Sequence, residues 1–310
     1  MSFSTSIKEE ITKNEQTNID YLLELSAYVR YTGVINKNII TLTMENASVA
    51  RRIYKDIKNN FGINIQIKVR IQKRFRVKQI YILEIKEKVN EILDALNIIR
   101  DGKKIYPDEF FIDTPEEKAS FIRGAFLACG SINNPSTSGY HLEFTTNYKQ
   151  DGIYISKLLK DFNIISKVIK RNNKYMTYVK SAEMISDTIK LLGAINSFFY
   201  FEDIRIYRDH KNMVNRLNNC EIANQEKTFK AGMQQLENIN YLKENDLFDL
   251  LDEKTSIVAN YRVKYPESSL QELADIITSE EDYKIGKSGI NHHFIKINEL
   301  VKKHKGSVKK

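Results

Sequence analysis

Histidine and cysteine, the residue types best suited to holding a metal ion or acting as nucleophiles, are few and poorly spaced in this sequence. The 310 residues include five His and two Cys, and the cysteines form no CxxC pair, which excludes a thiolate zinc site and a disulfide framework. His292 and His293 are adjacent on an expected helix and diverge by about 100°, so they cannot easily reach one ion. His141 and Glu143 share an expected strand face, but two ligands do not make a metal site.

Catalytic motifs are absent as well. The sequence has no phosphate-binding loop, no GxGxxG motif, no HExxH motif and no activated-nucleophile motif. We therefore predict binding without catalysis, with no catalytic residue, no cofactor and no metal. No apolar run approaches the ~20 residues of a membrane span, so no membrane partner is expected. The N-terminus lacks a signal peptide's apolar segment, and with so few cysteines a reducing, cytoplasmic compartment is expected. A capping box at Ser6 and Glu9 is predicted to open the first helix.

Positive charge is concentrated in two segments. The whole chain carries 48 basic and 40 acidic residues, a net charge of +8. Residues 66–80 contain six basic residues and no acid, and residues 284–310 contain eight lysines and one glutamate. A general lysine excess can reflect codon composition. Uneven clustering instead favours a polyanion such as nucleic acid as partner.

The first basic segment alternates apolar and charged residues at a period of two, which predicts a β-hairpin turning near residues 72–74. One face is expected to lie in a core. The other would present Lys68, Arg70, Arg74, Arg76 and Lys78. Like charges repel across neighbouring strands, so this face is predicted to contact phosphates. The alternative is a solvated edge whose lysines prevent aggregation.

The first two thirds of the chain contain one pattern twice. A helix from about residue 18 ends in LSAYVRYTG (25–33), and a helix opened by TPEE (114–117) ends in IRGAFLACG (122–130). The first is followed by a strand (39–44), a helix (47–60), the basic hairpin and a helix (88–98). The second is followed by a strand (140–146), a helix (152–162), two strands (164–169 and 175–180) and a helix (184–192). Small residues in both nonamers (Ser26, Ala27, Gly124 and Ala125) would let two helices approach closely. We predict an α+β fold with a duplicated αββαββα domain.

This duplicated unit resembles the LAGLIDADG homing-endonuclease fold. The resemblance implies two sheets that form a saddle with basic concave faces for the DNA major groove. It also implies a metal-binding acid at the penultimate position of each nonamer. Those positions are Thr32 and Cys129 here, and neither supplies the charge that holds Mg²⁺. The chain is therefore predicted not to be an enzyme, while a nuclease that uses other acids remains a second hypothesis.

The last third is expected to be wholly helical. We place the domain boundary near residues 212–220, giving domains at 1–215, with repeats at about 1–100 and 113–200, and at 216–310. A capping box at Ser269 and Glu272 opens one helix. After a loop at 278–287, Ser288 is expected to cap a second helix with Ile290, Phe294, Ile297 and Val301 inward. With residues 258–263 in a supporting helix, residues 269–303 are predicted to form a helix-turn-helix.

The second of these helices is predicted to enter the DNA major groove. Asn291 and His292 would lie nearest base edges, while Lys287, Lys296 and Lys302 would hold phosphates. The full set of predicted DNA contacts is Ser269, Lys287, Ser288, Gly289, Asn291, His292, His293, Lys296, Lys302 and Lys303.

Three segments resemble the WhiA family over essentially the full length: RGAFLACGSINNP with YHLEF (123–144), NMVNRLNNCEIAN with KTFKAG (212–232), and SLQELAD with KSGINH (269–292). The resemblance implies a degenerate LAGLIDADG domain joined to a helix-turn-helix. It also implies a nucleoid-associated regulator of cell division, chromosome segregation or sporulation-type transcription that binds double-stranded DNA. The family usually has Asn-His-Arg where this chain has Asn291-His292-His293, which would weaken a charged contact.

A third hypothesis is a scaffold. Its LAGLIDADG-like domain would bind a protein, such as RNA polymerase, a sigma factor or another regulator, while the helix-turn-helix tethers the complex to DNA. The sequence does not fix the oligomeric state, and a monomer is expected.

Overall fold

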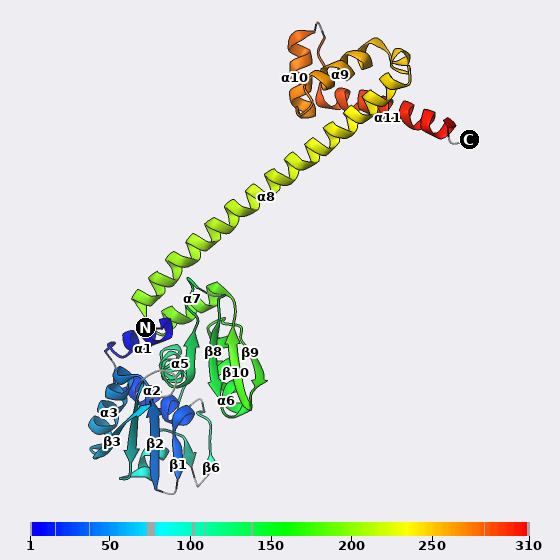
Figure 1. The fold of residues 1–310 in the computed structure, drawn as a ribbon. Helices are drawn as coiled ribbons and strands as arrows, with labels where there is room; N and C mark the ends of the chain where they lie inside the picture. The colour runs from blue at the N-terminus through cyan, green and yellow to red at the C-terminus, as the bar shows by residue number, and fades with distance from the viewer. Residues whose placement is uncertain are drawn as a thin grey trace. The chain divides into compact units, whose positions relative to one another are not determined.

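The computed structural model describes residues 2–308 except 16, 37, 73–77, 101–102, 109, 138 and 282. The chain divides into two compact units, residues 1–208 and 209–310. Helix α8 (Ile195–Glu244) begins in the first unit and continues into the second, as Figure 1 shows. None of the described helices is long and apolar enough to cross a membrane.

The first unit contains the duplicated αββαββα pattern, which confirms the predicted fold class. The first copy comprises α2 (Asn18–Thr32), β1 (Val34–Asn36), β2 (Ile39–Met44), α3 (Ala47–Phe61), β3 (Ile65–Gln72), β4 (Lys78–Ile85) and α4 (Val89–Ala95). The second comprises α5 (Pro115–Cys129), β7 (Gly130–Ile132), β8 (Leu142–Thr146), α6 (Lys149–Asp161), β9 (Lys167–Arg171), β10 (Lys174–Val179) and α7 (Ala182–Leu191). A short ribbon of β5 (Ile99–Arg100) and β6 (Lys103–Lys104) follows the first copy.

Each copy folds into a four-stranded antiparallel sheet with the same strand order, β1-β2-β4-β3 in the first and β7-β8-β10-β9 in the second. Leu42 of β2 pairs with Leu83 of β4, and both side chains are buried. In the second sheet Phe144 pairs with Thr177, and both are again buried. Because the two sheets have the same strand order, the two copies of the sequence pattern adopt the same fold.

Helix α1 (Phe3–Ile11) begins earlier than predicted. Its N-cap is Ser2, whose hydroxyl accepts the Thr5 N–H at 3.2 Å. Ser6 lies inside the helix, where its hydroxyl bonds back to the Ser2 carbonyl. The prediction of a capping box at Ser6 and Glu9 was therefore wrong, because a residue one turn earlier already satisfies the first free N–H groups.

Helices α2 and α5 pack backbone to backbone. A Cβ atom added at Gly124 would lie 2.2 Å from the Glu24 carbonyl oxygen and 2.6 Å from the Glu24 Cα atom. Only glycine permits this approach, which confirms the predicted close contact through small residues. Ala27 and Ala125 are fully buried, while the Ser26 hydroxyl instead donates to the Leu96 carbonyl at 2.6 Å.

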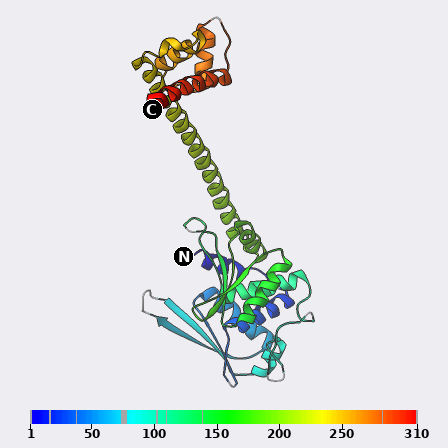
Figure 2. The same cartoon turned by 90° about the vertical axis from the view of Figure 1, so that its right-hand side faces the viewer.

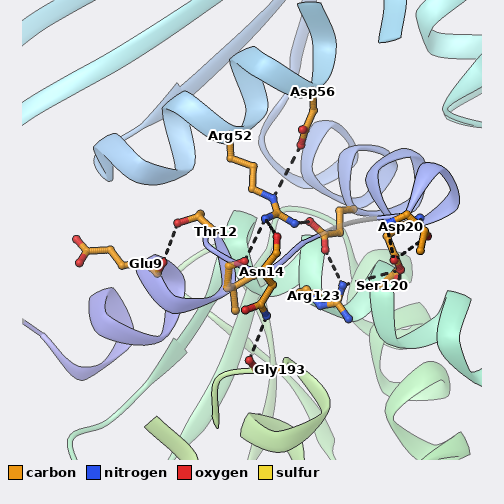
Figure 3. A network of polar contacts seen from close by, with 12 residues as sticks. Glu9, Thr12, Asn14, Asp20, Arg52, Asp56, Ser120, Arg123 and Gly193 are labelled. Carbon is orange, nitrogen blue, oxygen red and sulfur yellow. Dashed lines mark hydrogen bonds and ion pairs between the residues drawn. The ribbon is translucent and has the colours of Figure 1, made fainter. Parts of the chain in front are cut away.

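A buried ionic network joins the two copies at this contact (Figure 3). The Glu24 carboxylate accepts from Arg52 of α3 at 2.8 Å and from Arg123 of α5 at 2.8 Å. Arg52 also donates to the carbonyls of Ile11 at 3.2 Å and Asn14 at 2.9 Å. A single carboxylate on α2 therefore links α3 of the first copy to α5 of the second. None of these three charged residues was singled out from the sequence.

Asp56 lies at the edge of this network, 4.0 Å from the Arg52 Nε atom. Burial raises the pKa of the Asp56 carboxyl to about 6, although the nearby Arg52 guanidinium opposes the shift. Because the folded-state pKa lies above the ordinary value, the ionised carboxylate is disfavoured in the folded state. This group therefore lowers stability as the pH rises through 6.

The second unit is wholly helical in its described part. After α8 come a 3-10 turn η1 (Phe248–Leu250) and the helices α9 (Glu253–Lys264), α10 (Leu270–Glu280) and α11 (Lys287–Val308). Helix α10 continues to Glu280, beyond its predicted end, so the connection to α11 shortens to residues 281–286. The Glu281 N–H still bonds to the Ile277 carbonyl, which explains the extra turn.

The helix contact at Gly124 can be tested with Gly124→Ala. The added methyl group meets backbone atoms, so we expect the free energy of unfolding to fall by about 1–3 kcal/mol or more. Gly139→Ala is the control, since a Cβ there has nothing within 4 Å. Thermal denaturation that gives equal melting temperatures for both variants would contradict the proposed packing.

The pKa of Asp56 predicts a pH-dependent effect of Asp56→Asn. The neutral amide avoids the disfavoured buried charge, so the variant should be more stable than the original by about 2–3 kcal/mol near neutral pH. The gain should shrink to a small fraction at about pH 4, where Asp56 is protonated in the folded state and about half protonated in the unfolded chain. Urea denaturation at both pH values measures this, with the exposed Asp187→Asn as control. A gain that does not depend on pH would exclude the assigned titration.

Candidate nucleic-acid interface

Helices α9, α10 and α11 pack around one small core. Its fully or nearly buried members are Ile239, Leu242, Val258, Ala259, Leu273, Ala274, Ile277, Ile290, Phe294, Ile297 and Val301. The predicted capping box opens α10, with the Ser269 hydroxyl accepting the Glu272 N–H and the Glu272 carboxylate accepting the Ser269 N–H. The predicted inward face of α11 is confirmed.

Helix α11 begins one residue before the predicted cap. The Ile290 N–H donates to the Gly286 carbonyl, so the helix is entered from Gly286 and Ser288 lies within the first turn. The prediction that Ser288 caps this helix was wrong. A side chain at Gly289 would approach Ile285 at 2.9 Å, which ties the start of the helix to the preceding loop.

The outer face of α11 is basic and accessible. Lys287, Ser288, Asn291, His292, Lys296, Lys302 and Lys303 are all exposed. The Lys296 ammonium lies 3.1 Å from the Asp252 carboxylate and stays half-exposed. These side chains could donate to phosphates or base edges, and their individual DNA contacts stay predictions.

His293 points inward rather than outward. Its Nδ1 atom lies 2.7 Å from the hydroxyl of Thr255, a buried residue of α9. Burial lowers the pKa of His293, which favours the neutral ring. The predicted outward orientation was wrong because Asp252 caps α9 and fixes Thr255 where the ring can reach it. His293 therefore joins α11 to α9, and Asn291 and His292 remain at the surface.

Arg262 of α9 is the main feature that the sequence analysis missed. It is 1% exposed, and its Nη1 atom donates to the carbonyls of Tyr265, Pro266 and Ser268 at 3.2, 3.4 and 2.6 Å. Its guanidinium also lies over the Phe294 ring, 5.4 Å from the centroid. Arg262 thus fixes the loop between α9 and α10. Its helical spacing of four from the buried Val258 was a signal that could have revealed it.

The basic hairpin departs from its prediction in two ways. Its apolar face is open to solvent, with Ile67, Val69 and Ile71 exposed at 51, 55 and 57%. This occurs because β3 is the edge strand and α3 packs against β2 and β4 (Figure 2). The basic face is also partly neutralised, since the Lys68 ammonium lies 2.5 Å from the Glu84 carboxylate on β4.

Arg70 has no ion-pair partner within the described part of this hairpin. The predicted Arg74 and Arg76 and the side chain of Lys78 lie outside the described residues, as does the turn itself. The role of this face in DNA contact therefore stays a prediction.

The ends of α2 and α5 carry no carboxylate at the predicted positions. The Thr32 hydroxyl donates to the Tyr28 carbonyl at 2.7 Å, and the Cys129 thiol donates to the Ala125 carbonyl at 3.3 Å. Burial raises the pKa of Cys129 to about 12, so the thiol stays protonated and is a poor metal ligand or nucleophile. Lys8 of α1 donates to the Leu127 carbonyl at 3.0 Å and occupies the end of α5.

Among the side chains that the structure describes, no three His, Cys, Asp or Glu residues come together to hold an ion. His141 and Glu143 do pair, with 3.0 Å between Nε2 and the carboxylate, but they stand alone as a pair.

Fold and site define the class of this protein: a duplicated LAGLIDADG-like unit without its acids, joined to a helix-turn-helix. Models of the WhiA N-terminal LAGLIDADG-like domain, the WhiA LAGLIDADG-like domain and the WhiA C-terminal HTH domain match residues 20–99, 118–211 and 214–301. The chain belongs to the WhiA family.

Similar proteins and a similar solved structure also carry the WhiA name. Proteins named "Probable cell division protein WhiA" from Bacillus cytotoxicus and Macrococcus caseolyticus are 40% and 39% identical. Each alignment covers 98% of this chain, and 97% and 96% of the respective relatives. The crystal structure of full-length WhiA from Thermatoga maritima superposes with a TM-score of 0.58 at 24% identity, covering 98% of this chain and 99% of that one. That likeness supports the fold.

The role of Arg262 can be tested with Arg262→Met. The substitution leaves three loop carbonyls without their donor, and each unsatisfied buried group costs about 1–3 kcal/mol. We expect faster amide hydrogen exchange in residues 265–275 and a lower melting temperature. Arg216→Met on the exposed surface of α8 is the control. Unchanged exchange in the loop would show that the guanidinium does not hold it.

Proposed function

We propose that this chain is a non-enzymatic protein that binds double-stranded DNA through α11. The observation that carries the proposal is the exposed basic face of α11, whose opposite face packs into the core formed with α8, α9 and α10. A helix-turn-helix places the second of its two helices in the major groove, which is wide enough to admit it. Asn291 and His292 would read base edges there, and Lys287, Lys296, Lys302 and Lys303 would contact phosphates.

The names of the relatives support a role in bacterial cell division. At about 40% identity over nearly the full length, their family role transfers to this chain as a proposal. We extend it to regulation of chromosome segregation or sporulation-type transcription, by a cytoplasmic protein associated with the nucleoid. RNA polymerase, a sigma factor or another regulator would be the protein partner of such a factor.

Loss of the nuclease acids supports binding without cleavage. Mg²⁺-dependent hydrolysis of a phosphodiester needs carboxylates that hold the ion against the phosphate and the attacking water. Thr32 and Cys129 occupy the positions where the nuclease pattern has acids. Each side chain donates a hydrogen bond to a backbone carbonyl of its own helix. Incubation of plasmid DNA with the protein and Mg²⁺ should leave the DNA intact, and specific cleavage would contradict this part of the proposal.

A scaffold role is the second candidate, and one observation favours it. Ile67, Val69 and Ile71 form an exposed apolar row on a free edge strand. Exposed apolar rows are typical of surfaces that bind protein rather than phosphate. In this version the first unit binds a protein while α11 holds DNA.

The proposal predicts a strong salt dependence of DNA binding. If six to eight phosphates are neutralised, log K should fall with log salt at a slope of about −5 to −7, from about −0.9 per phosphate. Fluorescence anisotropy with a labelled duplex and the full chain measures this slope. A slope of about −2 would show that a single small patch touches DNA.

Two substitutions distinguish contacts to base edges from contacts to phosphates. Lys302→Ala should make the slope shallower by about 0.9, whereas Asn291→Ala should reduce preference for a selected target duplex and leave the slope unchanged. Lys264→Ala is the control, because its ammonium already pairs with Glu280 at 3.1 Å. If Lys302→Ala and Asn291→Ala both bind like the original chain and the control, α11 is not the DNA-binding element.

A further inference from the structure

A hollow of about 260 Å³ lies in the second unit among α8, α9, α10 and the start of α11. Lys227 comes from α8, Arg262 from α9, Gln271 from the first turn of α10 and Lys287 from the first residue of α11. Helix α8 is held tightly here, since a Cβ atom at Gly232 would lie 2.9 Å from the Pro266 carbonyl oxygen. The close approach brings Lys227 to the ends of two helices of the helix-turn-helix.

The lining of the hollow is cationic and contains no acid. It includes Lys227, Arg262 and Lys287 and no Asp or Glu. Glu267 and Glu272 line the neighbouring groove instead, and the Glu272 carboxylate is already held by the Ser269 N–H at 2.7 Å.

Arg262 is a buried cation that pairs with no carboxylate among the described residues. Its described partners are carbonyl oxygens, and its buried Nε atom has no hydrogen-bond partner. Burial lowers the pKa of Arg262, and no anionic group opposes that shift. A buried guanidinium of this kind is stabilised by an anion that enters the hollow beside it.

The start of α10 adds a second attraction for an anion. The helix has eleven residues, and Leu270 and Gln271 in its first turn line the hollow. Ser269 already caps the Glu272 N–H, so the N–H groups of Leu270 and Gln271 remain at the positive dipole end of the helix. Phosphate groups are favoured at such positions.

We propose that this hollow binds one phosphodiester group of the DNA backbone, held by Lys227, Lys287 and the first turn of α10, with Arg262 supplying buried positive charge. The inference rests on the proposed function and deepens it, because it extends the DNA contact onto α8. DNA is favoured over a free anion since Lys287 begins the same helix that presents Asn291 and His292. In helix-turn-helix docking the first helix, here α10, crosses the DNA backbone.

The test uses the full chain with two probes, a labelled DNA duplex and inorganic phosphate. Lys227→Ala should weaken DNA binding several-fold and make the salt slope shallower by about 0.9. Lys227→Arg should restore both. Lys230→Ala, an exposed lysine on the same helix that does not line the hollow, should leave both nearly unchanged.

The outcomes are distinguishable. One outcome is that Lys227→Ala keeps the original salt slope of DNA binding while Lys302→Ala makes that slope shallower. The hollow is then not a DNA contact, and the proposed function stands. Another outcome is that inorganic phosphate raises the melting temperature of the original chain but not of Lys227→Ala, while Lys227→Ala keeps the original salt slope of DNA binding. The hollow then binds a free anion, and the proposal is overturned. If the original chain does not bind DNA at all, the proposed function itself fails.

Discussion

The first unit depends on the approach of α2 and α5 at Gly124. Here the backbone of one helix touches the backbone of the other, and the Glu24 carboxylate joins Arg52 and Arg123 across the two copies. Burying three charges is costly unless each is well paired and hydrogen-bonded. The network therefore fixes how α2 and α3 of the first copy are placed against α5 of the second.

The same two helices end at Thr32 and Cys129, the positions at which the LAGLIDADG resemblance implies metal-binding acids, and neither residue is an acid. Thr32 and Cys129 bond back to their own helices, and Lys8 occupies the last turn of α5. The packing that creates the fold is thus independent of the acids that create the activity. This separation explains how a LAGLIDADG-like unit persists in a chain for which we propose binding alone.

Much of the architecture could be predicted from local patterns. The duplicated nonamers, the capping boxes at Thr114 and Ser269 and the inward face of α11 all rest on short-range spacing, and the structure confirms them. The features that differ from the prediction depend on contacts between residues that are distant in the sequence. The exposure of Ile67 depends on how far helices reach over an edge strand, and the inward turn of His293 depends on Thr255, distant in sequence. Buried charges such as Glu24 and Arg262 resemble surface residues until their partners are known.

In the function that we propose, α11 selects the sites on the chromosome at which this protein binds. Genome-wide mapping of bound DNA tests it most directly, in cells that carry either the original chain or the double variant Asn291→Ala with His292→Ala. Both residues are exposed, so the variant should fold normally. We expect discrete bound sites for the original chain and their loss in the variant. An unchanged set of sites in the variant would contradict the account.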